Sequence, residues 1–226
     1  MLLYYITDRK QFPGTVAEQR SKLLDKIAEA GRVGIDFIQL REKDLSAREL
    51  ESLARDAVSL LTDTTRDSRP VTRFLINSRT DIALACGTDG VHLTSTDISP
   101  ADARAITSRS GRNDFLVAAS CHSAQEVLLA ESHGADFVVL APIFGKASTG
   151  THGLGLQSIR DLTHGSPDDR RIEAGDTRSR IPVLALGGVT IENAKACVDA
   201  GGAGIAAIRL FQENHVEHVV KSLRAY

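Results

Sequence analysis

The stretch Gly34-Ile-Asp-Phe-Ile-Gln-Leu-Arg-Glu-Lys-Asp44 contains an apolar run that predicts a buried strand, and the run ends abruptly in charged residues. Its beginning recurs three times along the chain, each time as a helix-ending glycine followed by an apolar strand. The recurrences are Gly87-Thr-Asp-Gly-Val91, Gly134-Ala-Asp-Phe-Val138 and Gly202-Ala-Gly-Ile205. The chain is therefore predicted to repeat one unit of strand and helix.

The spacing of apolar residues between these recurrences alternates in the same way, and Ser46-Ala-Arg-Glu49 matches a capping box at the start of a helix. Together these patterns predict eight strand–helix units. Strands are expected at 2–6, 36–40, 73–77, 89–93, 115–118, 136–140, 182–186 and 204–208. Helices are expected at 16–32, 46–61, 82–86, from 99 onward, 124–133, 157–162, 191–200 and in a last amphipathic segment ending at 224.

Regular alternation of strands and helices requires a parallel sheet with right-handed crossovers. Eight units in 226 residues favour a closed (β/α)8 barrel, the TIM barrel, over the alternative of an open doubly wound sheet. We predict one barrel domain over residues 1–226. Residues 165–180 are polar and lack apolar periodicity, so we expect them to form an exposed insertion in this domain.

The composition is that of an ordinary globular protein with an aliphatic core. Lys and Arg number 27 against 29 Asp and Glu, a formal net charge of -2, which supplies no general attraction to nucleic acid or an acidic membrane. The apolar segments are far shorter than the roughly 20 residues that span a bilayer, and the first residues lack the pattern of a signal peptide. We therefore expect a cytoplasmic protein. The three cysteines, Cys86, Cys121 and Cys197, are scattered and are expected to be small core residues.

Polar residues follow most of the predicted strands, where a barrel places its active mouth. The second strand leads to Gln39, Arg41 and Lys43, the third to Asn77 and Ser78, the fourth to His92 and Asp97, and the fifth to Ser120 and His122. The sixth leads to a loop with Lys146 and Ser148, and the seventh to Gly187 and Gly188.

Each candidate has a functional and a purely structural interpretation. Alternating residues of a strand share a face, so Arg41 and Lys43 can converge on an anion such as a diphosphate, or they can pair with Glu42 and Asp44. Gly187 and Gly188 can offer backbone N–H groups to a phosphate or form a tight turn.

Three further residues carry the same ambiguity. Asp97 can hold Mg²⁺ or belong to the start of the following helix. His122 is a candidate for proton transfer, but the adjacent Cys121 points to the opposite face of a strand and is expected in the core. His92 lies within its strand, where a packed, hydrogen-bonded histidine is the default.

Taken together, these residues resemble the thiamin phosphate synthase and TenI family, whose fold is the (β/α)8 barrel. The resemblance runs from Tyr5 to Phe211. It is carried by Tyr5-Ile-Thr-Asp-Arg9, Gln39-Leu-Arg-Glu-Lys43, Ile76-Asn-Ser-Arg-Thr-Asp-Ile-Ala-Leu84, Asp89-Gly-Val-His-Leu93, Ser120-Cys-His-Ser123, Gly134-Ala-Asp136, Pro142-Ile-Phe144, Ala185-Leu-Gly-Gly188 and Gly204-Ile-Ala206.

The resemblance implies a transferase of thiamin biosynthesis that joins hydroxymethylpyrimidine diphosphate to thiazole phosphate and releases diphosphate. Departure of diphosphate leaves a pyrimidine-stabilised carbocation, which the thiazole nitrogen captures. By this resemblance, Gln39, Arg41, Lys43, Asn77 and Ser120 line the pyrimidine diphosphate site. Asp97 is implied as a ligand of Mg²⁺, and Gly188 with the backbone around Ile208 is implied to take the thiazole phosphate.

Three positions depart from the synthase pattern. Ser78 stands where synthases have an aspartate, and a hydroxyl is a weaker magnesium ligand than a carboxylate. Lys146 and Ser148 stand in the loop where synthases carry a Thr-x-Thr-Lys stretch around the diphosphate. Arg209 stands where a small residue beside the thiazole phosphate is common.

These departures leave alternatives beside the synthase, which we favour. TenI proteins isomerise a thiazole carboxylate phosphate with a histidine at the position of His122. A barrel that has lost catalytic ligands can also bind phosphate compounds without turnover. The sequence leaves the oligomeric state open and is compatible with a homo-oligomer.

Overall fold

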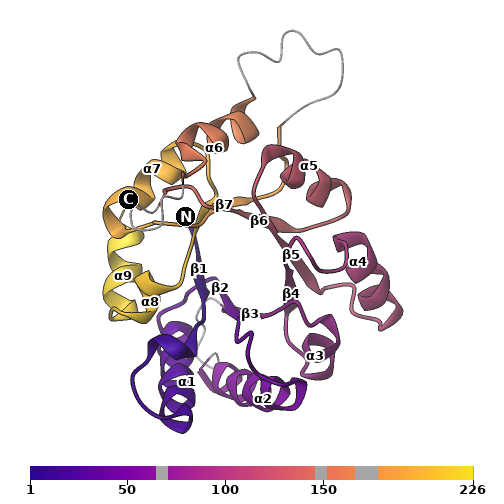
Figure 1. Cartoon of the computed structure of the whole chain (residues 1–226), viewed down its shortest axis with the longest axis vertical. Coiled ribbons are helices and arrows are strands. Elements are labelled where there is room, and N and C mark those ends of the chain that lie inside the picture. The colour runs from indigo at the N-terminus through magenta and orange to yellow at the C-terminus, as the bar shows by residue number, and fades with distance from the viewer. Residues whose placement is uncertain (65–70, 146–151, 166–177, 226) are drawn as a thin grey trace.

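The computed structural model describes residues 1–64, 71–145, 152–165 and 178–225. Eight parallel strands close into a barrel in chain order, with helices outside them (Figure 1). The closure confirms the predicted (β/α)8 barrel and excludes an open sheet. The strands are β1 (Leu2–Ile6), β2 (Phe37–Leu40), β3 (Arg73–Asn77), β4 (Gly90–Leu93), β5 (Leu116–Cys121), β6 (Phe137–Leu140), β7 (Val183–Ala185) and β8 (Gly204–Ala207).

The predicted helices are present, with small shifts of their ends. They are α1 (Val16–Arg32), α2 (Ala47–Thr64), α3 (Thr80–Ala85), α4 (Pro100–Arg109), α5 (Ala124–Ser132), α6 (Gly155–His164) and α7 (Ile191–Asp199), with a 3-10 helix η1 (Arg9–Gln11) after β1. The last amphipathic segment is not one helix but two, α8 (Arg209–Gln212) and α9 (Val216–Leu223). Most of the predicted insertion, residues 166–177, lies outside the described residues. None of the described helices is long and apolar enough to cross a membrane.

Local chemistry explains where several helices begin. Ser46 Oγ accepts a hydrogen bond from Glu49 N at 3.3 Å and Glu49 Oε2 accepts one from Ser46 N at 2.9 Å, so the predicted capping box is confirmed. Ser99 caps α4 with its side chain alone, because Ser99 Oγ accepts from Asp102 N at 3.1 Å, and Pro100 occupies the first helical position.

The repeated unit has a structural role that its apolar pattern did not reveal. In three of the four copies an aspartate at the start of the even-numbered strand accepts a hydrogen bond from a backbone N–H of the preceding strand. Asp36 bonds Leu3 N at 2.8 Å, Asp89 bonds Phe74 N at 2.8 Å, and Asp136 bonds Val117 N at 2.6 Å. The fourth copy has Gly204 at this place, where an added Cβ would lie 2.0 Å from Leu2 O. The strand that closes the barrel on β1 therefore has no room for a side chain here.

Two apolar layers hold the barrel together. The larger layer fills the space between strands and helices, and the smaller fills the barrel interior. Within the smaller layer, Tyr4 packs edge-on against Phe37 and Phe137, with ring centroids 5.7 and 5.6 Å away. This aromatic layer fills the barrel interior below the carboxyl ends of the strands. The polar side chains at those ends therefore lie above a packed apolar layer. The interior layer comprises Tyr4, Ile6, Leu75, Ala118, Phe137, Val139, Leu184 and Ala206.

Candidate active site

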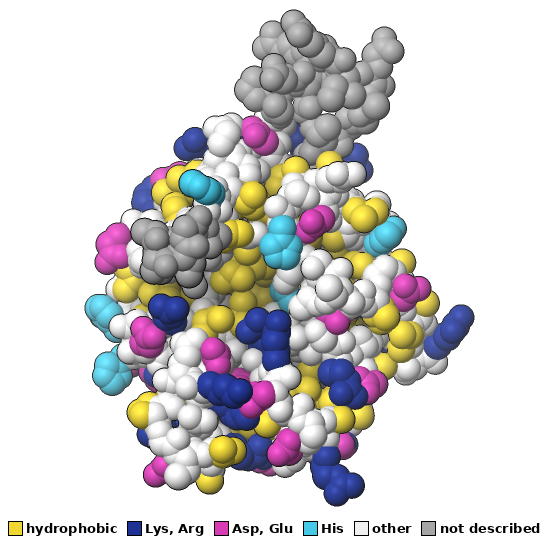
Figure 2. Space-filling view, viewed as in Figure 1, with side chains coloured by type: hydrophobic (Ala, Val, Ile, Leu, Met, Phe, Trp, Pro, Cys, Tyr) yellow, Lys and Arg dark blue, Asp and Glu magenta, His cyan; other side chains and the backbone are white. Residues whose placement is uncertain are grey.

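The mouth at the carboxyl ends of the strands is hollow at its centre. Figure 2 shows yellow hydrophobic side chains lining this hollow, with dark-blue Lys and Arg and cyan His side chains at its margin. Strand register places the interior positions of neighbouring strands side by side, as with Asn77 of β3 beside His92 of β4. The rim of a parallel barrel therefore gathers the residues that follow separate strands.

A chain of hydrogen bonds crosses the barrel just below the mouth. Gln39 Nε2 donates to Tyr4 Oη at 3.0 Å, Tyr4 Oη lies 3.1 Å from His92 Nδ1, and His92 Nε2 lies 2.8 Å from Ser120 Oγ. Tyr4 and His92 are buried. Burial, together with the nearby charge of Arg41, lowers the pKa of His92 to about 3, so the ring is neutral.

The neutral ring sets the direction of this relay, which we define as Gln39, Tyr4, His92 and Ser120. We assign the ring proton to His92 Nε2, because the buried Tyr4 hydroxyl has no acceptor among the described residues other than His92 Nδ1. In this tautomer Tyr4 donates to Nδ1, and Nε2 donates to Ser120. The Ser120 hydroxyl is left as a donor toward a ligand. Gln39 Oε1 accepts no hydrogen bond from the described residues, so it is left as an acceptor. The sequence prediction of a packed, hydrogen-bonded His92 is correct, but its link between two predicted site residues was missed.

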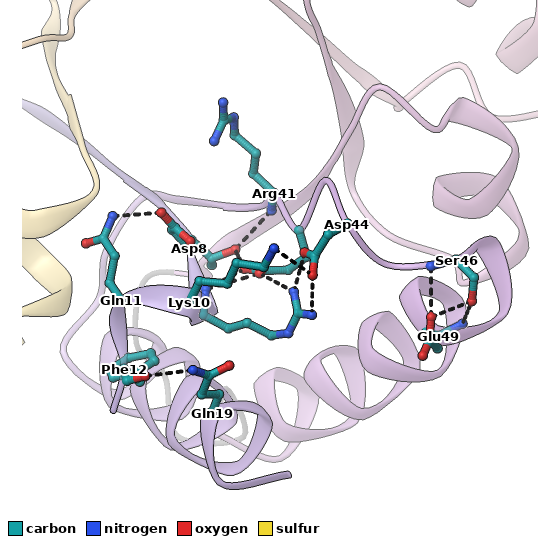
Figure 3. A network of polar contacts seen from close by, with 12 residues as sticks. Asp8, Lys10, Gln11, Phe12, Gln19, Arg41, Asp44, Ser46 and Glu49 are labelled. Atoms are coloured by element: carbon teal, nitrogen blue, oxygen red, sulfur yellow. Dashed lines mark hydrogen bonds and ion pairs between the residues drawn. The ribbon is translucent and has the colours of Figure 1, made fainter. Parts of the chain in front are cut away.

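Arg41 and Lys43 do not pair with Glu42 and Asp44, the structural alternative that the sequence left open. Arg9 binds both carboxylates, and no ion pair joins Arg41 or Lys43 to any carboxylate in the described part of the chain. Figure 3 shows the Arg41 side chain extending away from Asp44, with only its backbone N joined to the network. Two cations are therefore available to an anion at the mouth.

The third and fourth strands contribute oxygen-rich loops. Asn77 Nδ2 donates to Ser78 Oγ at 2.8 Å, and Ser78 has the left-handed φ of 64° that is uncommon for a residue with a side chain. Asp97 Oδ2 accepts from Thr94 N at 2.6 Å and from Thr94 Oγ1 at 2.8 Å, so one carboxylate oxygen holds its own loop. The described residues contain no group of three or more His, Cys, Asp or Glu arranged to hold a metal ion.

His122 and Cys121 separate as their strand positions predict. Cys121 is buried, and burial raises the pKa of its thiol to about 12, which confirms a core residue. His122 is exposed, with Nδ1 3.3 Å from Glu126 Oε2, which also accepts from His122 N at 2.7 Å.

The seventh strand ends in a turn that only glycine fits. Gly187 and Gly188 have φ values of 98° and 66°, and a Cβ added to either would lie 2.8 Å from a carbon of Pro142 or Phe144. Both glycines are thus required by the packing of the loop after β6 against this turn. Gly188 N donates no backbone hydrogen bond within the described residues, so its N–H remains available.

The eighth strand ends at Ala207 and is followed by Ile208 and Arg209. Ile208 precedes the short helix α8, and Arg209 is exposed with no ion pair among the residues that the structure describes. Lys146 and Ser148 lie outside the described residues, so the predicted loop contacts stay predictions.

Comparison with known proteins identifies the class. The family described as thiamine monophosphate synthase matches residues 3–211. A thiamine-phosphate synthase of Methanospirillum hungatei is 35% identical over 208 residues, covering 91% of this chain and 87% of the relative. Another, of Methanoculleus marisnigri, is 32% identical over 226 residues, covering 98% and 93%.

A solved structure agrees with these relatives. The thiamine phosphate pyrophosphorylase from Pyrococcus furiosus superposes with a TM-score of 0.76 at 27% identity, covering 99% of this chain and 94% of that chain. The chain belongs to the thiamine monophosphate synthase family. The predicted family and the predicted barrel are confirmed.

Proposed function

We propose that this chain joins hydroxymethylpyrimidine diphosphate to thiazole phosphate, releasing diphosphate and forming thiamin phosphate. The observation that carries the proposal is the pair of unpaired cations, Arg41 and Lys43, at a mouth whose floor presents Ser120 as a donor and Gln39 as an acceptor. A diphosphate needs the first feature. An aminopyrimidine has ring nitrogens that accept hydrogen bonds and an exocyclic amine that donates them, so it needs a donor such as Ser120 and an acceptor such as Gln39.

In this mechanism, Arg41 and Lys43 stabilise the negative charge that grows on the departing diphosphate. Cations held at fixed positions act on that charge without reorganisation at the moment of reaction. Gln39 and Ser120, with Asn77 beside them, orient the pyrimidine ring so that its exocyclic carbon faces the thiazole nitrogen. Lys146 and Ser148 are proposed to add contacts to the diphosphate from the loop after β6.

The chemistry of the oxygen donors fits a magnesium ion that arrives with the diphosphate. Asp97 has one carboxylate oxygen outside its loop hydrogen bonds, and Ser78 and Asn77 offer neutral oxygens. Mg²⁺ is commonly held by one or two carboxylates together with water and substrate phosphates. Asp97 would hold the ion, with Ser78 as a weak ligand, and the bound ion would supply further charge neutralisation to the diphosphate.

The opposite arc of the mouth is proposed to take the thiazole phosphate. Its donors are the backbone N–H of Gly188 and the backbone around Ile208, near Gly187 in the same turn. Arg209 is exposed beside this backbone and adds a positive charge toward a monophosphate.

A second candidate reaction, the isomerisation of a carboxythiazole phosphate, is favoured by one observation. His122 is exposed and faces Glu126, which is a suitable arrangement for a proton-transfer group. The free cations of the other arc have no task in that reaction, because its substrate carries no diphosphate. We therefore keep the synthase as the conclusion, acting in the cytoplasm on small phosphate substrates.

The test is a coupling assay on the purified protein with both substrates, with and without magnesium. We expect thiamin phosphate to form and to depend on magnesium. Folded protein that forms none would contradict the proposal, and proton exchange on the carboxythiazole phosphate would then test the second reaction. Light scattering on the same sample tests whether the chain is a homo-oligomer.

A further inference from the structure

Arg9 follows β1 and is a buried cation that lies between two carboxylates of the segment after β2. Its side chain is 6% exposed, and Nη1 lies 3.0 Å from Glu42 Oε2 and 2.7 Å from Asp44 Oδ1. Nη2 donates to Asp44 Oδ2 at 2.8 Å, so the contact with Asp44 is bidentate. The Arg9 guanidinium holds the pKa of Asp44 well below its usual range. Figure 3 shows Asp44 turned toward this network, together with Lys10.

Glu42 is held even more completely than Asp44. Its side chain is 1% exposed, and its oxygens accept from Thr7 Oγ1 at 2.7 Å and from Arg9 N at 3.1 Å. Thr7 Oγ1 in turn accepts from Arg41 N at 2.9 Å. The end of β1 is therefore joined to the end of β2 at the residues that carry the charges.

The stretch 41–44 alternates cation and carboxylate along the sequence, so each cation adjoins a carboxylate in the chain. In the structure the stretch passes from the end of β2 into a turn in which Leu45 N donates to Glu42 O at 3.2 Å. Arg9 occupies both carboxylates, and neither Arg41 nor Lys43 pairs with a carboxylate in the described part of the chain. Without Arg9, the Asp44 carboxylate, 37% exposed, would keep only its ion pair with Lys10 among the described residues, and Lys43 is its neighbour in the sequence. Pairing between them would then compete with any anionic ligand.

We propose that Arg9 is a positioning residue that keeps Arg41 and Lys43 free for a diphosphate by occupying Glu42 and Asp44. Arg9 touches no substrate in this role. Arg9 pairs with the carboxylates that follow β2, so that the cations of the same stretch stay available to a polyanion at the mouth. The inference rests on the proposed function in one respect, that Arg41 and Lys43 bind the diphosphate.

The test compares Arg9→Met with the triple variant Arg9→Met, Glu42→Gln, Asp44→Asn. Arg9→Met leaves both carboxylates without their guanidinium partner. The triple variant also removes the two negative charges, which could otherwise compete with the ligand for Arg41 and Lys43. Binding of inorganic pyrophosphate is measured by calorimetry, and KM is measured for each substrate. Lys10→Met is the matched control, because Lys10 contacts Asp44 at 3.1 Å and carries the same charge but leaves the bidentate contact intact.

We expect Arg9→Met to weaken pyrophosphate binding by about ten-fold, because ion pairs at the mouth must first be broken. The KM for thiazole phosphate should not change. The triple variant should recover to within about three-fold of the original affinity, and Lys10→Met should lose less than about three-fold, the size of a screened distant charge. If Arg9 only braced the loops, the triple variant would bind as weakly as Arg9→Met or more weakly, which would overturn the proposal.

A second variant covers the case in which Arg9→Met does not fold. Asp44→Asn retains Arg9 and Glu42, and we expect its pyrophosphate affinity to change by less than about three-fold, because Arg9 already occupies Asp44. A larger gain would show that Asp44 competes despite Arg9 and would contradict the inference. If the unaltered protein neither binds pyrophosphate nor forms product, the proposed function fails. Unaltered protein that does both while Arg9→Met binds equally well overturns the inference alone.

Discussion

On the arc formed by β1 to β5, the mouth presents side chains, whereas the turns after β7 and β8 present backbone, with the exposed Arg209 beside them. The first arc ends in the cations Arg41 and Lys43 and in the relay from Gln39 to Ser120. The turn after β7 contains Gly187 and Gly188, where the loop after β6 leaves no room for a Cβ.

This difference suits two ligands of different chemistry. Side chains with fixed hydrogen-bond directions can distinguish one ring edge from another, because a wrong partner leaves a buried polar group unpaired. Backbone N–H groups bind a phosphate without distinguishing what it is attached to. The following substitutions should therefore affect the two substrates separately, and each would weaken the comparison if it did not.

Lys43→Ala should have the largest effect. Loss of one fixed charge at a leaving group costs about 10² to 10³ in kcat, and Lys43 has no ion pair in the described part of the chain that would compensate. The measurement is steady-state thiamin phosphate formation, with KM determined for both substrates. The comparison predicts that the KM for thiazole phosphate is unchanged, and a parallel rise in that KM would contradict it.

Gly188→Ala should be next, and it should act on the other substrate. The added Cβ would lie 2.8 Å from Phe144 Cβ at a φ of 66°, so the turn must shift. Overpacking of this kind costs about 1 to 3 kcal/mol of stability, and we expect the KM for thiazole phosphate to rise by about ten-fold, the equivalent of 1.4 kcal/mol.

The control for this substitution is Gly111→Ala. Gly111 has a similar φ of 72° but has no atom near the added Cβ. It therefore reports the cost of the left-handed backbone alone, which is about 1 to 2 kcal/mol. Equal kinetic losses in both variants would show that the clash at Gly188 has no specific role.

His92→Gln should have a moderate effect on the pyrimidine substrate and a diagnostic effect on stability. The folded pKa of His92 is about 3 and its ordinary value is 6.5, so the unfolded chain binds more protons between these values. Stability is therefore lost as pH falls below about 6.5, with a slope of up to about 1.4 kcal/mol per pH unit.

Urea denaturation between about pH 4 and pH 7 measures this slope. The variant should lose the part of the slope that His92 contributes. Its KM for pyrimidine diphosphate should rise several-fold because Ser120 no longer has a fixed donor direction. An unchanged slope would show that His92 titrates normally in the folded chain.

His122→Ala should have the smallest effect on synthase activity. Its contact with Glu126 is an exposed pair, and such pairs contribute about 0 to 1 kcal/mol, so we expect less than about a five-fold change in the rate of coupling. Proton exchange on carboxythiazole phosphate, if the chain has that activity, should be lost in the same variant. A large loss of coupling would instead place His122 in the synthase mechanism.

The local pattern of the sequence was sufficient to predict the barrel, and it led to a specific hypothesis for the residues at the rim. The periodicity of strands and helices can be recognised within short stretches of sequence. Because a parallel barrel brings the carboxyl ends of its strands together, Gln39, Arg41, Asn77 and Ser120 could be predicted to lie at one mouth. The same reasoning placed Cys121 in the core from strand alternation alone. It misplaced the end of β5 and joined α8 to α9, because neither boundary has a strong local signal.

Contacts between distant residues could be decided only by the tertiary structure. No local pattern shows that Arg9 takes both carboxylates 33 and 35 positions away, that Tyr4 reaches His92 across 88 positions, or that Gly204 faces Leu2 O where its counterparts are aspartates. The periodicity of a strand determines which face a side chain occupies, but its partner depends on which strands close the barrel. The identity of the residues at the mouth was therefore a property of the sequence, whereas their charge state, their hydrogen-bond direction and their freedom to bind came from the folded chain.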